Sequence, residues 1–195
     1  MRLPRTFHIA VAMGLVTLHV GTLCVLTACQ QRSEERQTFR LERSSDTLSV
    51  LHLETIDHQG RVVRTDQWDL PYPVYRFCQG DVNADGADEA LVGVEKTTRF
   101  DPTVARRLFV FKNLKGHIRP LWLGSHLGGK LVDFTLVDGH IRTVEMSADS
   151  TRYSVVEYSW GQFSPSFERY IIQNTTKHES LEIFAAAQSG RTDSL

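Results

Sequence analysis

The sequence predicts an all-β fold: an antiparallel meander of blade-like hairpins that ends in a short C-terminal helix. Short apolar runs recur from about residue 38 to residue 172, and no long stretch in this region has a helical period. Turn dipeptides separate these runs, as at Asp138-Gly139, Lys115-Gly116 and Gln59-Gly60. Consecutive strands are therefore expected to pair as hairpins, in a propeller-like arrangement or in an open sandwich or barrel.

Individual strands are predicted where aliphatic, β-branched and aromatic residues gather between turn residues. These runs are residues 48–56, 61–68, 74–78, 89–95, 107–112, 118–123, 131–137, 141–146, 152–160 and 167–172.

A short internal repeat fits the same pattern. Residues 108–119 align with residues 131–142, both copies end in Gly-His-Ile-Arg, and Phe111 matches Phe134. The two hairpins together span about the length of one propeller blade. The β region has room for only about three blades, whereas closed propellers have four to eight, so an open arrangement is favoured.

The last segment, residues 175–195, has a helical pattern, unlike the β-rich region before it. Thr176 and Glu179 have the spacing of a capping box, and Leu181, Phe184 and Ala185 fall on one face of a short helix. This helix is expected either to dock on the sheet or to fray, since isolated short helices are marginal in water.

The N-terminus has the layout of a secretory signal peptide. Arg2 and Arg5 precede a mostly apolar run over residues 7–25, and no acidic residue occurs before Glu34. Leu26-Thr27-Ala28-Cys29 resembles a bacterial lipobox. The resemblance implies cleavage after residue 28 and acyl chains on Cys29, which would anchor the protein without crossing the membrane. An uncleaved anchor and a soluble secreted protein are the alternatives.

Three segments are expected after the signal peptide: a polar tether over residues 29–37, the β domain over 38–174, and the helix and tail over 175–195. No Asp follows Cys29, which in the usual Gram-negative sorting pattern favours the outer membrane, facing either the periplasm or the cell surface. Cys78 is the only cysteine within 38–174, so no internal disulfide is expected. The near-neutral charge, −1, argues against a nucleic-acid partner.

The most informative motif is an acidic loop over residues 81–89. Asp81, Asn83 and Asp85 alternate, so their side-chain oxygens can converge, and Gly86 allows the sharp turn that brings in the Ala87 carbonyl. Such an oxygen set suits Ca²⁺. An EF-hand is excluded, because its twelfth position, which should carry a bidentate Glu, is Val92.

The loop resembles the integrin-type calcium loop of FG-GAP and VCBS repeats. The resemblance implies side-chain ligation by Asp81, Asn83 and Asp85, and carbonyl ligation by Ala87. The ninth residue is Glu89 where those repeats usually carry Asp, and Asp88 lies beside it, so either could close the shell. The alternative is a metal-free acidic turn.

A second candidate site is the long connection over residues 96–106. Arg99, Phe100, Arg106 and the adjoining Arg107 could bind an anionic group such as a carboxylate, a phosphate or a glycan acid. A solvated hairpin end is the alternative.

These features favour a membrane-anchored lipoprotein whose calcium-stabilised β domain is a binding module for a protein or glycan partner. The alternative is a glycan-active hydrolase with a carboxylate pair, such as Asp88 with Glu89 or Glu157. Sequence motifs of zinc hydrolases and of the serine nucleophile elbow are absent, which favours the non-enzymatic interpretation.

Overall fold

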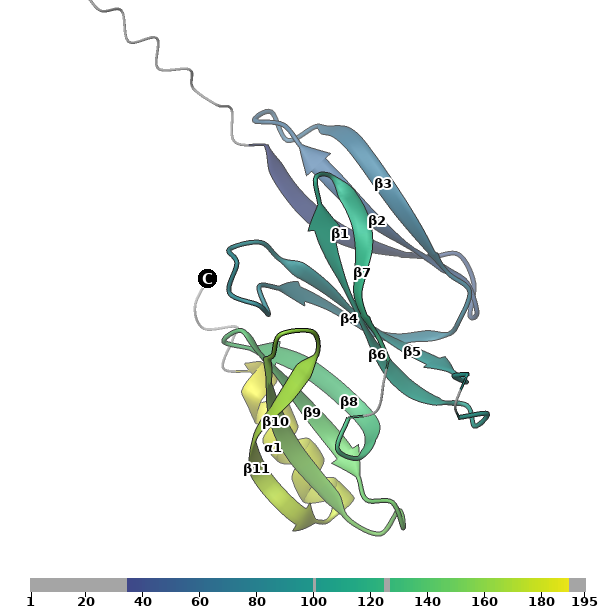
Figure 1. Cartoon of the computed structure of the whole chain (residues 1–195), viewed down its shortest axis with the longest axis vertical. Helices are drawn as coiled ribbons and strands as arrows, with labels where there is room; N and C mark the ends of the chain where they lie inside the picture. Colours follow the sequence, from purple (N-terminus) through teal and green to yellow (C-terminus); the bar gives the residue numbers. More distant parts are fainter. Residues whose placement is uncertain (1–34, 100, 125–126, 190–195) are drawn as a thin grey trace, which may run out of the picture. The chain divides into compact units, whose positions relative to one another are not determined.

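A computed structural model describes residues 35–99, 101–124 and 127–189 of the chain (Figure 1). These residues belong to one compact unit, Ser33–Leu195. Cys29, the predicted signal peptide and Phe100 lie outside the described residues.

The predicted fold class is confirmed, since antiparallel strands and one C-terminal helix make up the described regular structure. The elements are β1 (Arg36–Arg43), β2 (Ser49–Ile56), β3 (Val62–Leu70), β4 (Val74–Gly80), β5 (Glu89–Lys96), β6 (Ala105–Leu114), β7 (His117–Leu123), β8 (Lys130–Val137), β9 (His140–Met146), β10 (Tyr153–Trp160), β11 (Pro165–Thr175) and α1 (Lys177–Ser189).

The strands form three separate antiparallel sheets, each built from strands that are consecutive in sequence. We call them the first sheet (β1–β3), the second sheet (β4–β7) and the third sheet (β8–β11). The β6–β7 and β8–β9 turns have positive φ at both central residues, namely 55° and 80° at Lys115 and Gly116, and 50° and 77° at Asp138 and Gly139. These dihedrals are those of tight hairpin turns, whose twist matches that of the flanking strands.

Each of the ten predicted runs lies on one of the strands β2 to β11, but β1 was not predicted. Only Phe39 and Leu41 mark it as apolar, because the other side chains of this strand are polar. The strand begins inside the stretch expected to be a tether, since Arg36 and Gln37 pair with Ile56 and Thr55 of β2.

The internal repeat does not correspond to one blade. Residues 108–119 lie on β6 and β7, the last two strands of the second sheet, whereas residues 131–142 lie on β8 and β9, the first two strands of the third sheet. The suggestion that these two hairpins form a single blade is therefore wrong. The repeat reflects the common demands of two hairpins with similar turns.

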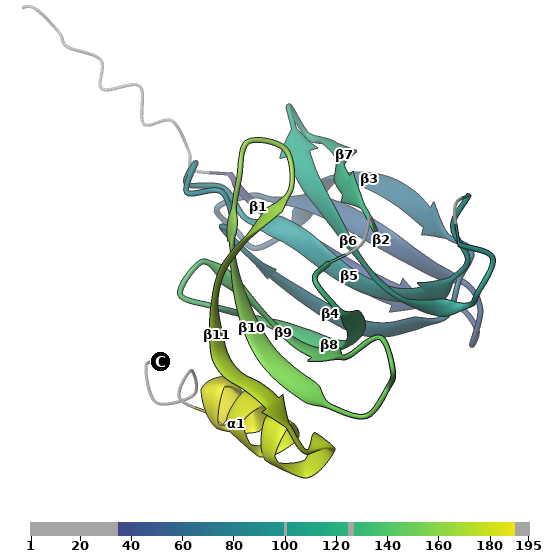
Figure 2. The same cartoon turned by 60° about the horizontal axis from the view of Figure 1, so that its bottom comes forward.

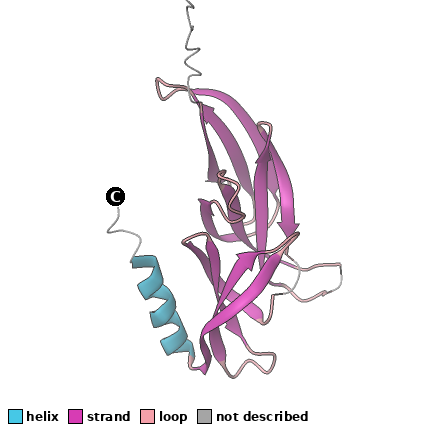
Figure 3. Cartoon of the chain, turned by 60° about the vertical axis from the view of Figure 1, so that its left-hand side comes forward, coloured by secondary structure: helices cyan, strands magenta, loops and turns pink. Residues whose placement is uncertain are grey.

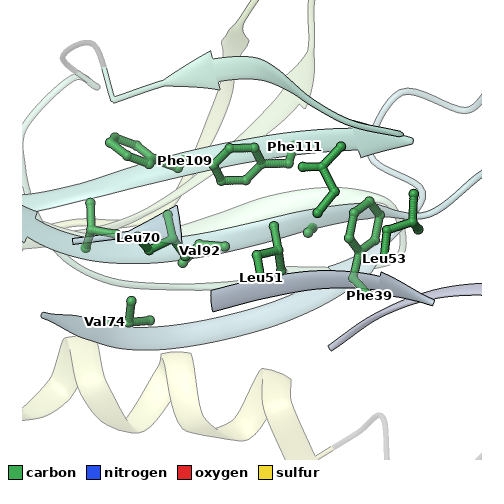
Figure 4. Packing of buried hydrophobic residues seen from close by; sticks show 11 residues of the cluster. Phe39, Leu51, Leu53, Leu70, Val74, Val92, Phe109 and Phe111 are labelled. Atoms are coloured by element: carbon green, nitrogen blue, oxygen red, sulfur yellow. The ribbon is translucent and has the colours of Figure 1, made fainter. Parts of the chain in front are cut away.

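The second sheet packs between the other two. Its strands β5 and β6 are buried on both faces, so their residues alternate between two cores. One core lies against the first sheet, where Phe39, Leu51 and Leu53 meet residues of the second sheet such as Val92 and Phe111 (Figure 4).

The other core lies against the third sheet and joins Leu91, Leu108 and Val110 to residues such as Phe134 and Val156. Gly93 faces this side: a Cβ added there would lie 2.5 Å from the Tyr75 ring and 2.8 Å from the Phe134 ring. The absence of a side chain at Gly93 therefore allows the two sheets to approach closely.

The helix α1 covers the face of the third sheet that is turned away from the second sheet (Figures 2 and 3). Phe184, only 3% exposed, packs there with Val144 and Val155. Thr176 caps the helix, because its Oγ1 accepts a hydrogen bond from the Glu179 N–H at 3.3 Å. Within the described residues, no helix has the length and apolar character needed to span a bilayer.

Candidate functional site

The acidic loop connects β4 to β5 in the second sheet, with Glu89 as the first residue of β5. Two residues of the loop have positive φ, Ala84 at 59° and Gly86 at 86°. Val82 is buried in the core shared with the third sheet, which fixes one side of the loop. The Asp81 carbonyl faces the β8–β9 turn, since a Cβ added at Gly139 would lie 3.4 Å from its oxygen.

The predicted side chains of the loop converge on its own backbone. The two carboxylate oxygens of Asp81 accept hydrogen bonds from the Asp85 N–H at 3.2 Å and the Gly86 N–H at 2.8 Å. Asn83 Oδ1 accepts from the Asp85 N–H at 2.9 Å, and Asp85 Oδ1 accepts from the Ala87 N–H at 2.9 Å. These bonds hold the alternating side chains toward the centre of the turn.

Glu89 lies beneath this turn and is 1% exposed. Its carboxylate accepts hydrogen bonds from the Val82 N–H at 3.1 Å and from Asn83 Nδ2 at 3.0 Å. Burial raises the pKa of Glu89 to about 7, the Val82 N–H opposes the rise, and the charges of the neighbouring Asp residues add to it. A carboxylate in such a place favours either a proton or a cation.

The structure separates the two acids at the end of the loop. Asp88 is exposed, whereas the adjacent Glu89 is buried under the turn. Among the residues that the structure describes, no group of three or more His, Cys, Asp and Glu side chains is placed to hold a metal ion. The side chains of Asp81, Asn83, Asp85 and Glu89 nevertheless all carry oxygen atoms, and oxygen ligands suit calcium.

The residues of the predicted binding loop differ in their exposure and in their contacts. Arg99 is exposed, and Phe100 lies outside the described residues. Arg106 joins two sheets: its Nε lies 3.1 Å from Glu95 Oε1, its Nη1 donates to the Val132 carbonyl at 2.5 Å, and its guanidinium lies 4.4 Å from the centre of the Tyr75 ring. Arg106 is therefore largely occupied by structural contacts.

Arg107 is 6% exposed, and its Nη2 lies 2.5 Å from Asp101 Oδ2. A hydrogen bond from the Thr103 N–H and one from Arg107 lower the pKa of Asp101, so this carboxylate is ionised at neutral pH. Arg106, Arg107 and Asp101 line a cavity of about 500 Å³. The third sheet supplies part of its wall, including Lys130, which had no signal in the sequence because sheet packing alone brings it there.

Glu157, the other carboxylate named for the hydrolase alternative, is paired. It is 3% exposed, and its two oxygens accept hydrogen bonds from Arg142 and Arg169. Burial raises the pKa of Glu157, but these two arginines outweigh it and hold the pKa below its ordinary value. Such a carboxylate stays ionised and is poorly suited to act as a general acid.

The exposed aromatic residues of β11 were not predicted as a site. Phe163 in the β10–β11 turn is 75% exposed, Phe167 53% and Tyr170 46%. The Phe167 and Tyr170 rings lie 5.0 Å apart, and Phe167 also contacts Tyr158. We call Phe163, Phe167 and Tyr170 the aromatic cluster.

No protein-family model and no curated protein sequence matches this chain.

Proposed function

We propose that the chain is a lipid-anchored binding module of a Gram-negative-type cell envelope. Acyl chains on Cys29 would hold it to the outer membrane, and its β domain would contact a protein or glycan partner. A structural Ca²⁺ in the loop over residues 81–89 would stiffen the second sheet beside the third.

The observation that carries the binding role is the aromatic cluster. Its three rings are about half exposed or more and lie in a strand and turn at the edge of the third sheet. The Phe167 and Tyr170 rings lie 5.0 Å apart, and Phe163 lies in the adjoining turn. Aromatic side chains contribute strongly to the energetics of interfaces, and exposed apolar side chains that lie together often mark an interaction site. Edge strands are also where partner chains add to a sheet.

Co-sedimentation with bacterial envelope fractions tests this role. All three hydrophobic cores lie within Ser33–Leu195, so a soluble form over this range carries the complete β domain. The domain should sediment with envelope, and replacing Phe163, Phe167 and Tyr170 by Ser should reduce binding at least about tenfold.

A matched control replaces exposed aliphatic residues elsewhere, Val62, Val63 and Leu114, by Ser. This variant should bind as the parent does. Protease treatment of the envelope before mixing distinguishes a protein partner, whose binding is lost, from a glycan, whose binding is kept. Equal loss in both triple variants would contradict the assignment to the aromatic cluster.

The calcium proposal rests on Glu89. A buried carboxylate surrounded by three Asp side chains has no basic partner in the described part of the chain, and Ca²⁺ would supply the missing charge. Glu89 rather than Asp88 would close the shell, because only Glu89 reaches under the turn. Thermal melting in Ca²⁺ and in excess chelator tests this, since an ion bound only to the folded state must raise the melting temperature.

The pH dependence gives a second readout. The pKa of folded Glu89, about 7, lies above its ordinary value of 4.5, so the folded state holds a proton that the unfolded chain releases. Without Ca²⁺, the free energy of unfolding should fall by at most about 3 kcal/mol as pH rises from about 4.5 to 7. With Ca²⁺ bound, Glu89 is ionised and this fall should disappear.

Glu89→Gln should remove both the calcium effect and the pH-dependent fall, whereas Asp88→Asn, an exposed neighbour, should retain them. A melting temperature indifferent to Ca²⁺ in the parent protein would refute the calcium site.

The lipid anchor is tested separately, by incorporation of labelled palmitate. The variant Cys29→Ala should abolish this incorporation.

A further inference from the structure

The cavity beside Arg107 lies where the beginning of β6 in the second sheet faces the beginning of β8 in the third. Its volume, about 500 Å³, falls in the range of pockets that hold small organic ligands. It is lined by residues from both sheets and from the connection that precedes β6.

Most of the wall is apolar. Val104, Ala105 and Leu108 contribute from the side of the second sheet, and Leu127, Leu131 and Met146 from the side of the third. Leu108 is fully buried, whereas Val104 is 66% exposed, so the apolar lining runs from the interior to the solvent. Such a wall suits the hydrocarbon part of a ligand.

The polar part of the wall is mainly basic. Arg106, Arg107 and Lys130 line the cavity together with a single acid, Asp101. Lys130 Nζ donates to the Ala148 carbonyl at 2.9 Å and to Ser150 Oγ at 3.2 Å, and it forms no ion pair within the described residues. Arg106 is paired with Glu95 and Arg107 with Asp101, so the unpaired positive charge of the lining is that of Lys130.

Arg107 adds an unsatisfied donor. The ion pair between its Nη2 and Asp101 borders the cavity, and its Nε–H is buried without a hydrogen-bond partner among the described residues. A buried donor without an acceptor is unfavourable, and most buried polar groups in folded proteins are paired. An acceptor oxygen from a ligand would satisfy this group.

We propose that this cavity binds a small carboxylate with an apolar body, of the size of a medium-chain fatty acid. The carboxylate accepts a hydrogen bond from Arg107 and is balanced by Lys130, while the hydrocarbon chain lies against Leu108, Leu131 and Met146. This site is independent of the calcium loop and of the aromatic cluster.

Octanoate is the probe, and the readout is the amide NMR signals of Ala105, Leu131 and Met146 in the domain over Ser33–Leu195. These signals should move on titration with octanoate. Octanol, which lacks the charge, and acetate, which lacks the chain, should each bind at least about tenfold more weakly.

Lys130→Met should weaken octanoate binding about tenfold without unfolding the domain, because Lys130 is exposed. Lys177→Met makes the same change at the start of α1 and should leave the affinity unchanged. Arg107→Lys keeps the charge but removes the Nε–H, and should also weaken binding, provided that its melting curve shows a folded domain.

The proposal is overturned if millimolar octanoate leaves the three amide signals in place, if octanol binds as tightly as octanoate, or if Lys130→Met binds like the parent.

Discussion

The two outer sheets of the β domain end the stack in different ways. The first sheet buries one face against the second sheet and presents polar side chains on its other face, where Arg40 and Glu54 form an ion pair at 2.7 Å. The third sheet buries both faces, one against the second sheet and the other, around Val144 and Val155, under α1.

This difference shows two solutions to one problem. A stack of sheets must end in faces that tolerate water, as the terminal units of repeat proteins do. In the first sheet, β2 achieves this by alternation, with Leu51 and Leu53 inward and His52 and Glu54 outward. In the third sheet, an apolar outer face is retained and the chain adds a helix to cover it.

Removal of α1 should have the largest effect. A chain that ends at Thr176 would expose the apolar outer face of the third sheet and lose the burial of Leu181, Ile183 and Phe184. Phe184 is buried and the other two are partly buried. Full burial of an apolar side chain contributes about 2 kcal/mol and partial burial less, so the loss should reach about 5 kcal/mol. Urea denaturation measures it, and binding of a hydrophobic dye reports the exposed face. An unchanged midpoint with no dye binding would show that the helix is not a structural cover.

Phe184→Ala tests the same cover with one side chain. The ring is 3% exposed among Val144 and Val155, so its loss should lower the free energy of unfolding by about 3 kcal/mol. Gln67→Ala, an exposed residue of β3, is the counterpart at the other end of the stack and should change it by less than about 0.5 kcal/mol. Comparable losses in the two variants would invalidate the contrast between a covered and a bare outer sheet.

Gly93→Ala extends the comparison to the inner face of the third sheet. The added methyl group would lie 2.5 Å from the Tyr75 ring of the same sheet and 2.8 Å from the Phe134 ring of the third sheet, so both rings must shift, at a cost of about 2 kcal/mol. Tyr75→Leu in the same chain should relieve the contact, so the double variant should lose less than the sum of the two single changes. Strict additivity in chemical denaturation would argue against close packing at this point.

Tyr75→Phe should have the smallest effect. The Tyr75 hydroxyl is buried without a hydrogen-bond partner in the described part of the chain, and burial raises the pKa of this phenol. Removal of an unsatisfied hydroxyl should leave stability unchanged or raise it by up to about 1 kcal/mol. A loss of more than about 1 kcal/mol in thermal or urea unfolding would mean that the hydroxyl is bonded in solution.

Local signals were sufficient for most of the fold. Gly116 and Gly139 mark hairpin turns through their left-handed backbone, and the strands that they join follow directly from alternating or continuous apolar runs. The strand β1 was missed because most of its residues are polar, and its place in the sheet depends on pairing with β2. The internal repeat led to the wrong prediction of a single blade for a related reason, since similar hairpins need not occupy similar positions in a sheet.

The candidate sites also differ in how far local sequence could predict them. The acidic loop was visible because its ligand-type residues lie within nine consecutive positions, although burial of Glu89 rather than Asp88 emerged only from the structure. Arg106 and Arg107 were named for anion binding, but Arg106 is held by Glu95 and Val132 across two sheets.

The sequence by itself determined the hairpins, their turns, the acidic loop and the C-terminal helix, because each depends on residues that are close together in the chain. Tertiary structure alone decided which hairpins share a sheet, which outer face α1 covers, and that Lys130 and Arg107 line the same cavity. These outcomes depend on how sheets that are distant in sequence bury their apolar faces against each other, and that packing leaves no short-range pattern in the chain.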